Sequence, residues 1–165
     1  MRYSLARLGG GPVVQMPNST ICPAPVVIDT NVLLALWIFA DPGVEPLRAA
    51  LAAGSLVPVR SVATDAELAE VLARPGLFAV PAARQTTLLH AWASGARLVD
   101  VIRPTAWRCR DPDDQKFVDL AVTADARWLI TRDKALLKLH RKVKATGLTI
   151  ATPAVFAQAA AGTVG

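Results

Sequence analysis

Short apolar runs alternate with helical patterns along most of the chain. Runs typical of buried strands occur at residues 26–29, 56–59, 98–102, 128–131 and 148–150. Apolar positions at helical spacing, bounded by Pro, Gly and capping residues, predict helices over residues 30–37, 44–53, 64–73, 81–92, 112–124, 134–139 and 153–162. This alternation predicts an α/β fold, a three-layer α/β/α sandwich with a central, mainly parallel sheet.

Capping residues, glycine and proline help to define several of these elements. Thr30 or Asn31 is expected to cap the first helix, and Gly54 occupies the C′ position that glycine favours. Pro58 has no N–H for a ladder bond, so the second strand is expected at a sheet edge. Pro81 is expected at the first position of its helix.

Composition bounds the domain organisation and the compartment. The chain has 165 residues, enough for one domain, and 53% of them are hydrophobic. Residues 1–24 are rich in Gly, Pro, Ser and Asn, so we expect a flexible N-terminal extension before a domain spanning 25–162. The longest uninterrupted apolar run, residues 32–40, is too short for a membrane span. Two cysteines make no disulfide framework, which favours the cytoplasm.

Four acidic positions carry the candidate chemistry. Asp29 and Asp133 follow apolar strands, and Glu67 and Asp114 fall in predicted helices. Because ligands collect at the carboxyl ends of parallel strands, these carboxylates are expected to converge on one crevice. Two carboxylates ~4 Å apart repel by about 4 kcal/mol at an effective dielectric of ~20. Such a cluster calls for a cation, and hard oxygen ligands favour Mg²⁺ or Mn²⁺.

Lys and Arg outnumber Asp and Glu along the chain. The net charge is +5, and the segment from residue 132 to 144 holds six Lys or Arg with Asp133 as its one acid. A polyanionic partner fits this balance, although a solvated basic helix face would look the same. The candidate RNA-binding residues are Arg110, Arg132, Lys134 and Lys138.

Four segments in order resemble the PIN-domain ribonucleases. They are residues 26–31 (VVIDTN), 67–75 (ELAEVLARP), 111–121 (DPDDQKFVDLA) and 129–133 (LITRD). The second segment is similar to a VapC-like subgroup, the toxins of toxin–antitoxin modules. The four acids stand 38, 47 and 19 residues apart, and the resemblance covers roughly residues 25–157.

The resemblance implies a metal-dependent endoribonuclease that cuts single-stranded RNA and leaves a 5′-phosphate and a 3′-hydroxyl. Asp29, Glu67, Asp114 and Asp133 match the catalytic, metal-holding positions, and the ion would be Mg²⁺ or Mn²⁺. Asn31 and Thr131 match positions that orient the carboxylates or the attacking water. A small antitoxin and a second copy of the chain are the partners it suggests.

Neighbouring acids leave alternatives at two of these positions. Glu70 lies three residues after Glu67 on the same helix face, and the family pattern of an acid followed by Leu fits Glu67 better. Asp114 is followed by small apolar residues in the family's register. Asp111, before a proline, is a natural N-cap, and Asp113 sits in the first turn. Glu70, Asp111 and Asp113 are therefore expected to support the ligands.

Two other classes of function are alternatives to the nuclease. A non-catalytic RNA-binding or regulatory module would keep the fold and the basic surface without holding a metal. A phosphoacceptor receiver domain also places Asp at strand ends, but it needs paired acids near the first strand and a Lys at a late strand end. Asp29 has no acidic residue before it, and Thr131 is followed by Arg-Asp.

Overall fold

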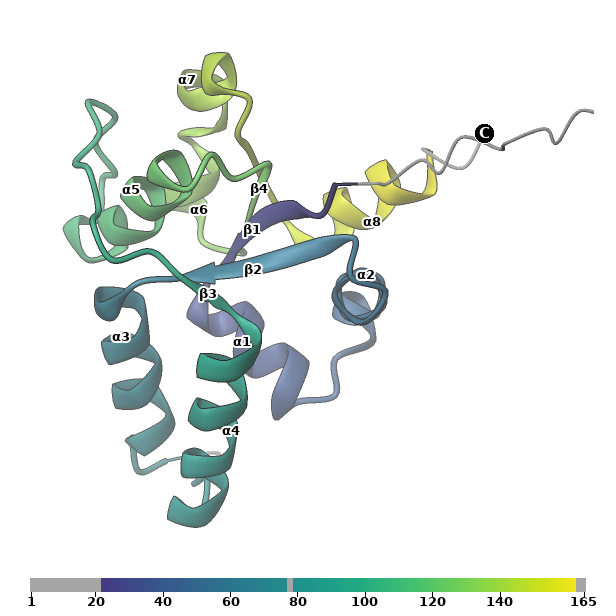
Figure 1. The fold of residues 1–165 in the computed structure, drawn as a ribbon, viewed down its shortest axis with the longest axis vertical. Helices are drawn as coiled ribbons and strands as arrows, with labels where there is room; N and C mark the ends of the chain where they lie inside the picture. Colours follow the sequence, from purple (N-terminus) through teal and green to yellow (C-terminus); the bar gives the residue numbers. More distant parts are fainter. Residues whose placement is uncertain (1–21, 77–78, 163–165) are drawn as a thin grey trace, which may run out of the picture.

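The protein is described from a computed structural model, which covers residues 22–76 and 79–162. In this part of the chain five strands form one sheet in the order β3-β2-β1-β4-β5, and each pairing is parallel (Figure 1). The strands are β1 (Ala24–Ile28), β2 (Leu56–Arg60), β3 (Arg97–Leu98), β4 (Trp128–Ile130) and β5 (Thr149–Ala151). Most of the predicted N-terminal extension, residues 1–21, lies outside the described residues.

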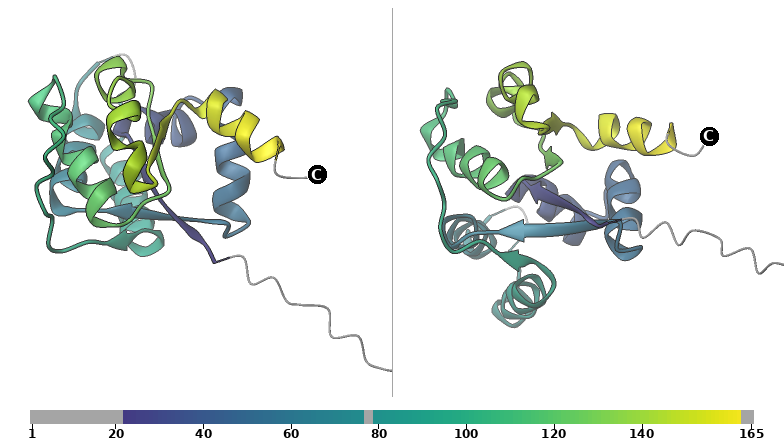
Figure 2. Two further views of the ribbon diagram at one scale, coloured as in Figure 1. Left: turned by 90° about the horizontal axis from the view of Figure 1, so that it is seen from above. Right: turned by 45° about the horizontal axis from the view of Figure 1, so that its top comes forward.

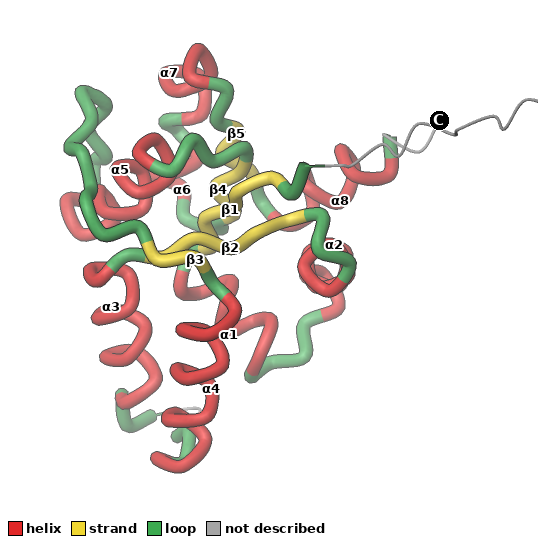
Figure 3. Tube along the Cα trace, viewed as in Figure 1, coloured by secondary structure: helices red, strands yellow, loops and turns green. Residues whose placement is uncertain are grey.

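Helices cover both faces of the sheet. Side chains alternate along β1, so that Val26 and Ile28 pack in one apolar cluster and Val27 packs in the other. The first cluster is completed by α1 (Thr30–Trp37), α2 (Glu45–Ala52), α3 (Val62–Ala73), α4 (Ala82–Gly95) and α8 (Pro153–Ala161). The second is completed by α5 (Gln115–Thr123), α6 (Lys134–Leu137) and α7 (His140–Val143) (Figure 3). The predicted three-layer α/β/α sandwich is confirmed.

The strands place their carboxyl ends at one end of the molecule. Figure 2 shows α8 at the far end of the sheet from α3 and α5, which lie where the strands point. Ser61 begins α3 with a capping box, in which its hydroxyl accepts from the Thr64 N–H and its own N–H donates to Thr64 Oγ1. Helix α3 therefore starts directly after β2 and two residues earlier than predicted.

The second strand corrects the expectation of a sheet edge, because β2 lies between β1 and β3. The carbonyl of Ser55 accepts from Ala24 of β1, whereas that of Arg60 accepts from Val99 on the other side. Residues alternate along a strand, so Pro58 faces the same side as Arg60. β3 pairs only with Val59 and Arg60, and the missing N–H of Pro58 therefore falls where no strand is present to need it.

Several predicted boundaries differ from the structure. The strand expected at residues 98–102 is only Arg97–Leu98, because its neighbour β2 ends at Arg60 and the chain beyond turns into α3. The helix expected at 134–139 ends earlier, as α6 at Leu137, and a second short helix, α7, follows it and was not predicted. Short 3-10 turns, η1 (Pro42–Val44) and η2 (Pro112–Asp114), precede α2 and α5, and a third, η3 (Lys144–Thr146), follows α7.

The capping predictions had mixed outcomes. Asp29, rather than Thr30 or Asn31, caps α1, because its carboxylate accepts from the Asn31 N–H. Gly54 follows α2 with a left-handed φ of 68°, as expected for C′. Pro81 is the N-cap of α4 and not its first residue.

Two further expectations concern the whole chain. Cys22 is exposed and Cys109 is buried, and both are free thiols. In the described residues, no helix combines the length and the apolar character that crossing a bilayer requires.

Candidate active site

Asp29 and Asp133 are held at the ends of two adjacent strands. β1 and β4 pair in register through Ile28 and Ile130, so the residues that follow them emerge side by side. The Thr131 hydroxyl donates to Asp29 Oδ2 at 2.7 Å and accepts from the backbone N–H of Asp133 at 2.9 Å. Asp29 is 4% exposed and Thr131 fully buried. Thr131 thus fixes the Asp29 carboxylate and the backbone that carries Asp133, in line with its predicted orienting task.

The Asp133 carboxylate also has a structural role. It accepts from the backbone N–H groups of Ala135 at 2.5 Å and Leu136 at 3.2 Å, and so caps α6. Both bonds use Oδ1, which leaves Oδ2 for another partner.

Glu67 and Glu70 project from α3, one turn apart, into the same cleft. Glu67 Oε2 lies 2.5 Å from the Lys116 ammonium, and both side chains are about three-quarters buried. Glu70 instead pairs with Arg74 at 2.8 Å on the exposed rim. Glu67 is therefore the more buried of the two acids.

The three aspartates around η2 have different surroundings. Asp111 caps η2 through the Asp113 N–H at 3.0 Å and is exposed. Asp113 is exposed too, and its backbone carbonyl accepts from Lys116 Nζ. Asp114 stands at the N-cap position of α5 but makes no side-chain capping bond. Among the described residues, no group donates a hydrogen bond to the Asp114 carboxylate.

The four predicted acids lie close enough to influence the pKa of one another. Burial, the largest cause, and repulsion from Asp133, Asp29, Asp111 and Glu67 together raise the pKa of Asp114 to about 6. Burial is also the main cause that raises the pKa of Asp29, opposed by the bonds from Thr131 and Asn31 and reinforced by Glu67 and Asp133. Carboxylates from β1, α3, η2 and β4 therefore interact across one space.

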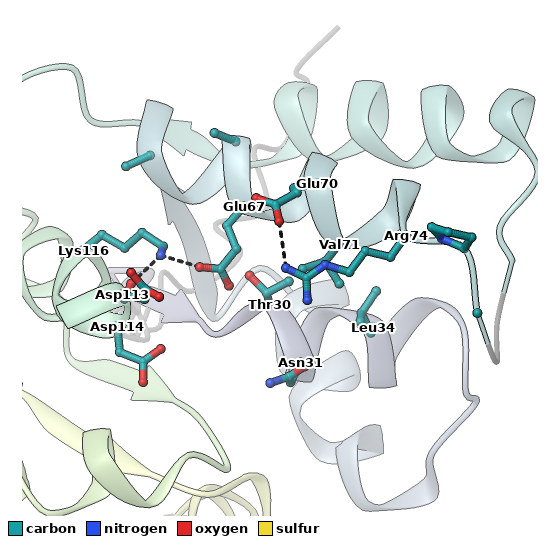
Figure 4. A pocket seen from close by; sticks show the side chains of 14 residues that line it. Thr30, Asn31, Leu34, Glu67, Glu70, Val71, Arg74, Asp113, Asp114 and Lys116 are labelled. Atoms are coloured by element: carbon teal, nitrogen blue, oxygen red, sulfur yellow. Dashed lines mark hydrogen bonds and ion pairs between the residues drawn. The ribbon is translucent and has the colours of Figure 1, made fainter. Parts of the chain in front are cut away.

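A cleft of about 730 Å³ opens between α1, α3 and η2 (Figure 4). Of the predicted residues, five line it: Asn31, Glu67, Glu70, Asp113 and Asp114. Asp29 is buried behind Thr30 and Asn31, and neither Asp29, Asp111, Thr131 nor Asp133 is part of the lining. Of the four predicted acids, Glu67 and Asp114 therefore line the cleft, whereas Asp29 and Asp133 do not.

The donor chemistry fits a hard divalent cation, because all four acids offer carboxylate oxygens and they repel one another. Their present spacing is wider than a coordination shell. In the described residues, no three of the His, Cys, Asp and Glu side chains stand close enough to share one ion. Lys116 engages Oε2 of Glu67, which leaves Oε1 as the oxygen of Glu67 without this partner.

The predicted RNA-binding cations lie outside the cleft lining. Arg132 pairs with Asp41 at 2.6 Å and lowers the pKa of that carboxyl, so its charge is already matched. Arg110, Lys134 and Lys138 are exposed. The cations that line the cleft are Arg74 and Lys116, which sequence reasoning did not select. The signals were present, since Arg74 lies four residues after Glu70 and Lys116 lies two after Asp114.

Comparison with known proteins now identifies the class. Residues 25–135 match the PIN domain family, and the chain belongs to that family. Its fold is similar to the crystal structure of VapBC2 from Rickettsia felis bound to a DNA fragment from their promoter, with a TM-score of 0.52 and 14% sequence identity. That match covers 78% of this chain and 98% of the other. Among curated proteins no match is found.

Proposed function

We propose that this chain is a metal-dependent endoribonuclease that hydrolyses phosphodiester bonds of single-stranded RNA. The observation that carries the proposal is the placement of four carboxylates near one another, which together with burial raises the pKa of Asp114 to about 6. Membership of the PIN domain family supports a nuclease. The net charge of +5 supports a polyanionic substrate.

The residues proposed to hold Mg²⁺ or Mn²⁺ are Asp29, Glu67, Asp114 and Asp133. A bound ion would lower the pKa of its water and stabilise the charge that develops on the phosphate. Thr131 keeps one Asp29 oxygen oriented by its hydrogen bond, and Asp133 keeps Oδ2 unused by the α6 cap. Asp114 has no internal donor to give up, which makes its carboxylate the most available of the four.

Substrate contacts follow from the lining of the cleft. Asn31 is exposed at the start of α1 and offers an amide to a phosphate or to the attacking water. Arg74 and Lys116 bring positive charge to the same cleft, and Arg110, Lys134 and Lys138 would extend the contact outside it. Neutralising phosphates in this way makes RNA affinity fall as salt rises.

The biological setting we infer is that of a toxin of a type II toxin–antitoxin pair in the cytoplasm. The support is the similarity in fold to VapBC2. A small antitoxin, encoded by a neighbouring gene, and a second copy of the chain are the proposed partners. Co-expression with the product of that gene, followed by size-exclusion chromatography, should give one complex that no longer cuts RNA. Separate elution with undiminished cutting would contradict the pairing.

The direct test is cleavage of a mixed set of single-stranded RNAs with Mn²⁺ or Mg²⁺. Controls are EDTA and Asp29→Asn, which keeps a side-chain oxygen to cap α1. We expect cutting that needs the metal and is lost in Asp29→Asn, with circular dichroism unchanged. Cutting that survives both EDTA and the substitution would overturn the assignment.

A second candidate function is an RNA-binding or regulatory PIN-like module without catalysis. One observation favours it: Lys116, a fixed cation, already neutralises Glu67, so the acids are partly compensated without an ion. Measurable RNA binding together with no Mn²⁺ binding in calorimetry would select this module. Binding of neither would remove the argument from basic charge as well.

A further inference from the structure

Lys116 is placed unlike the other Lys and Arg side chains that the structure describes. It lies in the first turn of α5, and its ammonium contacts Glu67 Oε2 of α3 and the backbone carbonyl of Asp113 in η2 (Figure 4). Its side chain is 23% exposed and that of Glu67 is 25% exposed. The ammonium also lies 5.4 Å from the centre of the Phe117 ring. One cation therefore joins two walls of the acidic cleft.

The other ion pairs of the described residues differ from this one. Arg74 pairs with Glu70 on the rim, Arg132 with Asp41, Arg48 with Glu45 and Arg60 with Asp65. None of these acids is among the four that are proposed to hold a metal. Lys116 is the partner of a proposed ligand, and it engages a carboxylate oxygen that an ion would need.

We propose that Lys116 is an internal counter-cation that competes with the divalent ion for Glu67 and so weakens metal binding. The inference rests on the proposed function and adds a positioning residue to it. Lys116 neutralises part of the acidic cluster in the metal-free protein, where the uncompensated carboxylates would repel one another. A divalent ion and an ammonium on the same carboxylate repel in turn, and their repulsion is screened less in a partly buried cleft than in water. An ion on Glu67 is therefore bound less tightly while the ammonium remains on Oε2 of the same carboxylate.

The test is calorimetric titration of the full chain with Mn²⁺. Lys116→Met keeps the length of the side chain and removes its charge, so we expect Mn²⁺ to bind roughly tenfold more tightly, within the usual range of coupling between sites. Lys116→Arg keeps the charge and should bind Mn²⁺ like the wild type. Lys142→Met is the matched control, because it removes one exposed positive charge from α7, and it should leave the affinity unchanged.

A double-mutant cycle shows whether the effect passes through Glu67. In a Glu67→Gln background the ammonium has no carboxylate to release, so Lys116→Met should no longer tighten Mn²⁺ binding. Thermal unfolding in EDTA checks that each variant is folded, and Lys116→Met should melt lower than the wild type. Should Met at this position prevent folding, Lys116→Gln provides the same comparison.

The outcomes separate this proposal from the nuclease assignment. Equal or weaker Mn²⁺ binding by folded Lys116→Met, with normal binding by the wild type, overturns the role of Lys116 and leaves the nuclease standing. Tightening that persists in the Glu67→Gln background also overturns it. If neither the wild type nor any variant binds Mn²⁺, the metal-dependent function and the competition fail together. Binding by Lys116→Met where the wild type binds too weakly to measure supports the proposal.

Discussion

Two aspartates five residues apart have opposite surroundings, Asp114 at the N-cap of α5 and Asp119 in the middle of that helix. Asp119 Oδ1 accepts from the Thr105 N–H at 2.9 Å, the Thr105 hydroxyl at 3.0 Å and Gln115 Nε2 at 2.8 Å. Asp114 accepts no side-chain capping bond and faces other carboxylates. Asp119 has its hydrogen bonds satisfied inside the protein and ties a loop to its helix. The Asp114 carboxylate has no such donor in the described part of the chain and is available to a ligand.

The contrast shows that the kind of neighbour, more than the position of an acid, separates structure from function. Asp114 ends the Asp-Pro-Asp-Asp segment and Asp119 follows it by five residues, and both are half-buried. Asp119 is surrounded by donors from residues 105 and 115. Asp114 is opposed by Asp133, Asp29, Asp111 and Glu67, in that order. A carboxylate held among carboxylates raises the energy of the metal-free protein, and a cation would relieve it.

The largest expected effect comes from Asp114→Asn. Loss of a partner that merely orients a ligand typically costs 10–100-fold in metal affinity or activity, so loss of a ligand itself should reduce Mn²⁺ affinity and RNA cleavage by more than about 100-fold. The urea midpoint in EDTA should not fall, because no described group donates to this carboxylate. Calorimetry and a cleavage assay measure the first effect. If Asp114→Asn bound Mn²⁺ as tightly as the wild type, Asp114 would not be a metal ligand and would not differ from Asp119 in this respect.

Asp119→Ala should lower stability and leave metal binding unchanged, and its effect should be smaller than that of Asp114→Asn. It leaves the Thr105 N–H without its acceptor, and the Thr105 hydroxyl and the Gln115 amide keep only the Trp107 carbonyl. Thr105 is only 8% exposed. The expected loss of unfolding free energy is about 1–3 kcal/mol, measured by urea denaturation. Mn²⁺ affinity should be unchanged, because Asp119 is not one of the charges that act on Asp114. Unchanged stability would mean that the network does not hold the loop.

The smallest effect concerns pH in the metal-free protein. The folded pKa of Asp114 is raised from 3.8 to about 6, so the folded chain binds more protons than the unfolded chain between these values. The contribution of Asp114 to the free energy of unfolding is therefore lost as pH rises through about 6. Solvent screens a half-buried group, which keeps the effect modest.

Urea denaturation in EDTA at about pH 5 and about pH 7 gives the measurement, with Asp114→Asn as the control. The wild type should lose more stability over this interval than the variant, because only the wild type carries the titrating group. An equal loss in both proteins would show that folding does not raise the pKa of Asp114.

The parts of the fold that were predicted depend on local pattern. Continuous apolar runs identified β1 and β4, and their ends placed Asp29 and Asp133 on adjacent strands. What could not be predicted depends on contacts between distant segments. β3 is short because its partner β2 turns into a capping box at Ser61, and no residue near 98–102 carries that information.

The candidate site divides in the same way. The four acids were selected from motifs, but the pairing of Lys116 with Glu67 links residues 49 positions apart. Arg132 was selected for its charge, and its neutralisation by Asp41 likewise depends on a contact across the fold. Whether a charge is free or matched is decided by packing, so a list of charged residues overestimates the surface that RNA can use.

Pro58 has a consequence beyond the geometry of its own strand. On the outer side of β2 ahead of β3, the backbone lacks the donor that an incoming strand would require. A neighbouring chain with an exposed edge would find one donor fewer there, which disfavours extension of the sheet by an added strand. A residue that looks like a weakness of the strand thus protects the protein at high concentration.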